Sequence, residues 1–188
     1  MVSVSGSVKS VKNSKLILAE VNLKIGIEMR QIVPGASGGI VQHLTGVLNA
    51  LFPCFPIHEY HVFTTIFNRH LFENIFPSVK VYSLPTRNFF QEVDRIILSE
   101  GIEVLFRSYP MNAILNFPLN RQVFFMPDVQ HEHFPEFFTP EILEQRKLAF
   151  NQALSWGGAI GTNTEFTRQD ILNLPATRCQ EVFIMGPA

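Results

Sequence analysis

The chain has 188 residues, 46% of them hydrophobic, and a formal net charge of -1. This length suits one domain with a full core, and the charge balance argues against nucleic acid as a partner, because binding to phosphate backbones needs excess lysine and arginine. The two cysteines, Cys54 and Cys179, lack the spacing of a metal or redox motif. They fit a reducing compartment, so we expect a cytoplasmic protein.

The first residues are rich in Ser, Lys and Val and lack the continuous apolar core of a signal peptide. We interpret residues 1–20 as a flexible leader and residues 21–188 as one domain. No apolar run reaches the roughly 20 residues that span a bilayer, so we expect no transmembrane segment. Most of the 18 phenylalanines are expected in the core. The alternative is that some cover a face meant for a second domain or for peripheral contact with a membrane.

Predicted strands and helices alternate along the chain. Alternating apolar and polar residues predict a first strand at 23–29, and apolar residues at helical spacing then predict a helix from 40 to about 52. The remaining strands are predicted at 60–67, 79–84, 103–106, 123–125, 159–162 and 181–185. Further helices are predicted from 89 to a stop at Gly101 and from 140 to about 155. This alternation predicts a Rossmann-like three-layer α/β domain, with about seven mostly parallel strands and helices on both faces.

A glycine-rich turn at 34–39 joins the first strand to the first helix. Its glycines, Gly35, Gly38 and Gly39, let the backbone turn tightly and let a ligand approach the N–H groups at the helix start. The spacing is that of neither a P-loop nor a dinucleotide fingerprint. The sequence therefore leaves two interpretations open, a tight turn packed against the sheet and a contact with an anion or a sugar.

The most informative stretch, 126–138, is a polar loop between a buried strand and a helix that starts near Thr139. It carries Asp128, His131 and His133 at the sheet edge where open α/β folds bind ligands. Asp128 and His131 are candidates for holding sugar hydroxyls or for proton transfer. The alternatives are a turn-stabilising role for Asp128 and a structural role for His131.

The same stretch contains an H-x-H unit. In an extended segment His131 and His133 would share one face, and with Asp128 they could hold the metal ion of a hydrolase. A mononuclear hydrolase site usually recruits a further ligand, and the sequence marks none. We keep this class as an alternative and expect no metal site and no cofactor.

Two further polar residues follow predicted strands. Arg107 comes after the strand at 103–106, where it suits an anionic group; the alternative is a surface or interdomain salt bridge. Glu165 follows the strand at 159–162 and is either a ligand or a helix-capping residue. With Thr162 it has capping-box spacing, and Thr164 is a competing N-cap.

Three segments, 34–39, 128–138 and 161–170, occur in an order that resembles the N-terminal domain of GT-B-type retaining glycosyltransferases of family 4. The resemblance runs from about Lys24 to the end of the chain. It implies a domain that binds a sugar, glycan or lipid-linked acceptor, a glycine loop near the donor phosphates, and a second domain that binds the nucleotide sugar without a metal. Pro127 stands where the family often has histidine, and we take His131 as the replacement imidazole.

This resemblance implies roles for the candidate residues. Asp128 and His131 would be catalytic, and the substrate-binding residues would be Gly35, Gly38, Gly39, Arg107 and Glu165. The donor domain is missing from the chain, so we expect a fragment or subunit that is inactive until such a domain is supplied in cis or in trans. The remaining alternative is a non-catalytic split subunit or remnant that binds a partner or a sugar.

Overall fold

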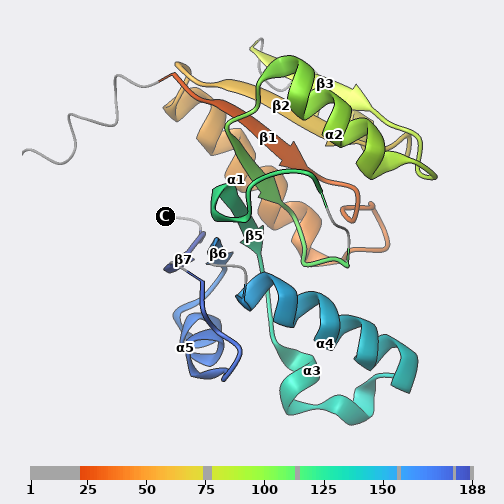
Figure 1. The fold of residues 1–188 in the computed structure, drawn as a ribbon, viewed down its shortest axis with the longest axis vertical. Coiled ribbons are helices and arrows are strands. Elements are labelled where there is room, and N and C mark those ends of the chain that lie inside the picture. Colours follow the sequence, from red (N-terminus) through yellow and green to blue (C-terminus); the bar gives the residue numbers. More distant parts are fainter. Residues whose placement is uncertain (1–21, 74–77, 113–114, 156–157, 180, 187–188) are drawn as a thin grey trace, which may run out of the picture.

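The computed structural model describes residues 22–73, 78–112, 115–155, 158–179 and 181–186. Seven strands form one sheet in the order β3-β2-β1-β4-β5-β6-β7, and each pairing is parallel (Figure 1). The strands are β1 (Lys24–Glu28), β2 (Glu59–Thr64), β3 (Val79–Ser83), β4 (Val104–Arg107), β5 (Gln122–Phe125), β6 (Ala159–Thr162) and β7 (Glu181–Ile184). The predicted Rossmann-like α/β fold is confirmed. The predicted leader, 1–20, lies outside the described residues.

Helices cover both faces of this sheet. They are α1 (Gly39–Cys54), α2 (Phe89–Glu100), α3 (Gln130–His133), α4 (Pro140–Ser155) and α5 (Glu165–Asn173), with short 3-10 helices η1 (Arg69–Leu71), η2 (Leu119–Arg121) and η3 (Pro135–Phe137). Among the described residues, no helix is long and apolar enough to cross a bilayer.

Adjacent strand residues show which helix covers which face. Val62 and Phe125 pack in the cluster that contains the buried side of α1. Their chain neighbours point to the opposite face, because side chains alternate along a strand. There Phe63 packs with α2, and Phe124 packs with α4 and α5. One face therefore carries α1 and the other carries α2, α4 and α5.

The strand order reverses direction between β1 and β4. The chain proceeds from β1 to β2 and β3 on one side, and from β4 to β7 on the other. Because all strands are parallel, their C-terminal ends meet at one edge. The glycine turn after β1 and the segment after β5 both lie there, as predicted, and the reversal is where such sheets usually bind ligands.

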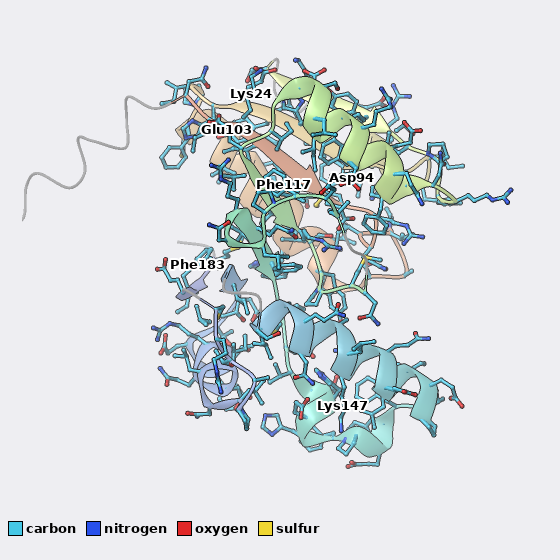
Figure 2. The ribbon with its side chains drawn as sticks, viewed as in Figure 1. Lys24, Asp94, Glu103, Phe117, Lys147 and Phe183 are labelled. Carbon is cyan, nitrogen blue, oxygen red and sulfur yellow. The ribbon has the colours of Figure 1, made fainter. Side chains whose placement is uncertain are left out.

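The connection from β4 to β5, described over 108–112 and 115–121, contains η2 and no α-helix in its described part. It runs between α2 and α4 (Figure 1). Asp94 of α2 fastens it, since its Oδ1 accepts the N–H of Asn116 at 2.9 Å. Figure 2 shows Asp94 close to the part of the connection that carries the buried Phe117. The connection is thereby held against α2.

The stretch 126–138 is not the open loop that the sequence predicts. It folds into α3 followed by η3. Asp128 starts this turn, because its Oδ1 accepts the N–H of Gln130 at 3.0 Å, which is a common role for aspartate two residues before a helical turn. The helical geometry determines where the two histidines point.

Candidate functional site

A cavity of about 690 Å³ opens at the C-terminal edge of the sheet beside the β1–β4 reversal. Arg30 and Arg87 come from the segments after β1 and β3, and Tyr109 comes from the connection after β4. The first turn of α2 and part of α4, between Ile142 and Phe150, complete the wall. Its volume falls in the range of small-molecule sites. This cavity is the candidate site of the described residues.

Arg146 of α4 lines the cavity and is held by Asp128. Its Nη2 donates to Asp128 Oδ1 at 3.0 Å. Its guanidinium carbon also lies 4.8 Å from the ring centre of Phe138, 5.4 Å from that of Phe150 and 5.9 Å from that of Tyr109. Asp128 itself does not line the cavity. Its contact with the site runs through the arginine that it orients.

His131 lies in α3 with only 1% of its surface exposed, and not in a solvent-facing loop as expected. Its ring meets that of Phe150 edge-on at 4.5 Å. Neither ring nitrogen forms a hydrogen bond with a described group, although Nε2 lies 3.4 Å from Glu132 Oε1. Burial, and next the charge of Arg146, lower its pKa. Burial therefore favours the neutral imidazole, and the ring packs behind Phe150, a residue of the cavity wall.

His133 points elsewhere, because the segment forms helix α3 and not the extended strand in which the two histidines would share one face. Residues two apart on a helix do not face one another. The Nε2 of His133 lies 2.9 Å from Asp170 Oδ2 on α5. The H-x-H unit therefore does not converge on one ion.

Within the described part of the chain, one cluster offers three potential metal ligands, Glu59, His61 and Glu100. It lies near the start of β2 and the end of α2, away from the cavity. Lys80 Nζ already sits 2.5 Å from Glu59 and 3.0 Å from Glu100, and these two carboxylates raise its pKa. An ammonium group thus occupies the place of a cation, and the cluster is an ion-pair network.

The three candidate glycines lie in the turn after β1 and at the first residue of α1, where they face open space. Gly35 and Gly38 have φ values of 80° and 55°, a region that glycine adopts without strain. No atom lies within 4 Å of a Cβ built on either of them or on Gly39. Ser37 holds the loop together, since its Oγ donates to Gln31 O at 2.6 Å and accepts the N–H of Val33 at 2.9 Å. These glycines do not line the cavity, and packing does not require their small size.

Arg107 is fully buried, so it is not the exposed residue that a surface salt bridge would need. It is the register neighbour of Glu28 across β1 and β4, with Nε 3.9 Å from Glu28 Oε2. Burial raises the pKa of Glu28, while Arg107 opposes the rise. Glu28 Oε1 also accepts the N–H of Arg30 at 2.7 Å. The buried pair therefore fixes the start of a segment that lines the cavity.

Arg107 lies against an aromatic ring of the cavity wall. Its guanidinium carbon lies 5.7 Å from the ring centre of Phe90, a lining residue, and 5.1 Å from that of Phe124. Arg107 is not among the residues that line the cavity.

Glu165 begins α5, and Thr164 is the N-cap, with its hydroxyl accepting the N–H of Thr167 at 3.1 Å. The predicted alternative of a capping box between Thr162 and Glu165 is therefore not formed. The Glu165 carboxylate pairs instead with Arg168 and accepts from Gln169 at 2.6 Å. It lies outside the cavity.

No protein-family model matches the chain, and no curated protein matches it. The site is therefore defined by its geometry. Sequence reasoning missed Arg30, Arg87 and Arg146. A signal existed for the last of these, because Arg146 shares one helical face with Ile142 and Phe150, at i-4 and i+4.

Proposed function

We propose that this domain is the acceptor-binding half of a glycosyltransferase. A sugar-containing acceptor occupies the cavity at the β1–β4 reversal, and a nucleotide-sugar-binding unit covers the same edge in cis or in trans. The observation that carries the proposal is the shared placement of the cavity and the open 34–39 loop at the C-terminal edge. The ordered motifs that resemble family 4 support it. The unpaired cysteines, Cys54 and Cys179, support a cytoplasmic setting.

The glycine loop suits the phosphates of a donor. Helix α1 starts at Gly39 with no side-chain cap and no acidic residue in its first turn. Its first N–H groups, at the positive end of a 16-residue helix, favour an anion. A leaving nucleotide diphosphate gains charge as the glycosidic bond breaks, and donors placed for that charge lower the barrier.

The predicted catalytic pair acts from behind the cavity wall in this proposal. Asp128 orients Arg146, and His131 supports Phe150, so both position groups that meet the acceptor. Glycosyl transfer depends on such positioning, because the acceptor hydroxyl has to be held in line with the bond that breaks.

Exposed aromatic rings support a covering unit. Phe134 and Phe137 follow β5, and Phe166 follows β6, with 48%, 67% and 76% of their surfaces exposed. All three lie on segments that begin at the C-terminal edge. Phe134 and Phe137 also stack on one another, with ring centres 5.5 Å apart, and exposed apolar side chains often mark a contact surface.

The test uses the purified chain alone and the chain fused to a GT-B donor domain. Each is incubated with a panel of uridine and guanosine diphosphate sugars and simple sugar acceptors. We expect saturable acceptor binding by both proteins and transfer by the fusion alone. Transfer by the isolated chain would contradict the need for a second unit, and a failure of every sugar and sugar phosphate to bind would end the proposal.

A second candidate is a non-catalytic sugar-binding subunit. It is favoured by one observation, that neither Asp128 nor His131 lines the cavity. Acceptor binding without transfer in every fusion that binds its nucleotide sugar would select this candidate.

A further inference from the structure

We infer that the ligand of the cavity beside the β1–β4 reversal is a sugar that bears a phosphate monoester, which makes the acceptor anionic. This inference rests on the proposed function and specifies its substrate class. Three arginines, Arg30, Arg87 and Arg146, line the cavity, and its described lining contains no aspartate or glutamate. The whole chain carries 15 basic and 16 acidic residues, so this one-sided charge is local.

Two of these arginines line the cavity without a carboxylate partner. Among the described residues, no carboxylate forms an ion pair with the guanidinium of Arg30 or Arg87. The Arg30 guanidinium lies over the rings of Phe89 and Phe90, 5.9 Å and 5.3 Å from their centres. Its hydrogen bond to Thr86 O is long at 3.5 Å. Stacking on rings holds the group in place without neutralising it.

Arg146 is the oriented member of the set. Nη2 donates to Asp128, and Nε is buried, so the donors open to a ligand are the remaining N–H groups of the two Nη atoms. Because a guanidinium carries five N–H donors in a planar fork, several remain after the Asp128 contact. Arginine pairs with phosphate through two parallel hydrogen bonds where geometry allows. A phosphate therefore meets one arginine already fixed and two more on neighbouring segments.

The remaining wall suits sugar hydroxyls. The side chains of Gln31, Asn112 and Gln145 supply neutral amides. The Gln31 amide is paired only weakly in the described structure, with Met111 Sδ at 3.3 Å, and thioether sulfur is a poor acceptor. Burial raises the pKa of Tyr109 to about 12, so its phenol keeps its proton and serves as a donor. A cavity of about 690 Å³ accommodates a phosphate together with a sugar ring.

The test measures binding by calorimetry with three probes: glucose 6-phosphate, glucose and inorganic phosphate. The proteins are the wild-type chain, Arg30→Gln, Arg87→Gln and a control, Arg95→Gln. Arg95 lies on α2 outside the cavity, and its side chain is 67% exposed, so the control makes the same charge change elsewhere. Thermal midpoints are recorded for each variant so that binding is compared between folded proteins.

We expect glucose 6-phosphate to bind about 10-fold or more tightly than either glucose or inorganic phosphate, since each charge-assisted contact is of that order. Arg30→Gln and Arg87→Gln should each lose about 10-fold in affinity, and Arg95→Gln should lose little. Raising NaCl from about 50 to about 300 mM should weaken the binding, because salt screens exposed charges.

The outcomes separate this inference from the proposal on which it rests. Glucose binding as tightly as its phosphate, with no effect of the arginine variants, would overturn the anionic ligand and leave the acceptor domain standing. Inorganic phosphate binding as tightly as glucose 6-phosphate would overturn the sugar part of the inference. Absence of binding by all sugars and sugar phosphates would remove the acceptor function itself.

Discussion

A single oxygen of Asp128 joins two helices: Oδ1 accepts the N–H of Gln130 at the start of α3 and the Nη2–H of Arg146 on α4, both at 3.0 Å. The segment after β5 is thereby connected to the wall of the cavity. The carboxylate is 46% exposed at its side chain, so its energetic contribution to folding is small. Its main effect is on the direction of the arginine.

Asp128→Ala is expected to weaken glucose 6-phosphate binding about 5- to 10-fold, because Arg146 loses its fixed direction and more side-chain entropy is lost on binding. The free energy of unfolding should change by less than about 1 kcal/mol. Calorimetry and urea titration check the two effects. Asp170→Asn is the matched control, since Asp170 pairs with His133 outside the cavity. Equal losses in both variants would argue against the positioning role.

Glu28→Ala is expected to destabilise the domain by about 3–5 kcal/mol, because it removes the buried carboxylate that faces Arg107. Urea unfolding measures the loss. Glu103→Ala is the control; Glu103 Oε2 accepts the N–H of Lys24 at an exposed site, and Figure 2 shows the two residues close together at the start of β1. The control should lose about 1 kcal/mol or less. A small loss in Glu28→Ala would show that the buried pair is not a structural requirement.

The pH dependence of stability should contain a contribution from His131. Burial lowers its pKa in the folded state, so below about pH 6.5 the unfolded chain binds a proton that the folded chain resists. The stability that the folded protein gains from a neutral His131 is fully present above that pH. It is lost as the pH falls toward the pKa of His131 in the folded state. Nearby Arg146 and Lys147 act in the same direction, whereas Glu132 and Asp128 oppose it.

His131→Leu removes this proton linkage. Below about pH 6.5, the unfolding free energy of the wild type should fall relative to that of the variant, by up to about 1.4 kcal/mol per pH unit. Buried His61, whose pKa is also lowered, contributes equally to both proteins and cancels. Parallel stability curves would show that the imidazole titrates normally. At neutral pH, His131→Ala should lower the free energy of unfolding by about 1–3 kcal/mol, because the ring is packed on Phe150.

Neighbouring glycines in the 34–39 loop should respond in opposite ways to alanine. Gly38 has a φ of 55°, so Gly38→Ala is expected to cost about 1–2 kcal/mol. Gly39 begins α1 without a positive φ and with open space around it, so Gly39→Ala should leave stability unchanged or raise it by up to about 1 kcal/mol. In an active fusion, Gly39→Ala should still reduce transfer, because the added methyl group faces the space proposed for donor phosphates. Unaltered transfer would place the donor elsewhere.

The fold could be predicted from local patterns because each parallel strand is a short apolar run next to a helix with its own apolar spacing. The helix at 140–155 and the strand at 159–162 were predicted with the bounds that the structure has. The positions of the two histidines were not predictable in the same way. Their direction depends on the turn that Asp128 induces, and a two-residue spacing places side chains together in a strand but apart in a helix.

The cavity was less visible in the sequence, because its wall is assembled from residues far apart in the chain. Arg30, Arg87 and Arg146 meet only after the strand order has reversed. For Arg107 the sequence indicates the position in the sheet but not the burial of the side chain. Its position after an apolar run indicates the correct edge, but its complete burial depends on Glu28 in the adjacent strand. Pairing between strands of such large sequence separation is not encoded in any local pattern.

The β4–β5 connection lets the binding site vary in evolution while the sheet is conserved. It runs where a crossover helix would otherwise fill the space between α2 and α4, and part of it, 109–112, forms the cavity wall. Insertions or deletions there would alter the shape of the binding site while every strand kept its register. The entropic cost of closing a longer loop grows slowly, by only about 0.6 kcal/mol for each doubling of length. Ligand preference and folding stability can therefore diversify almost independently in this architecture.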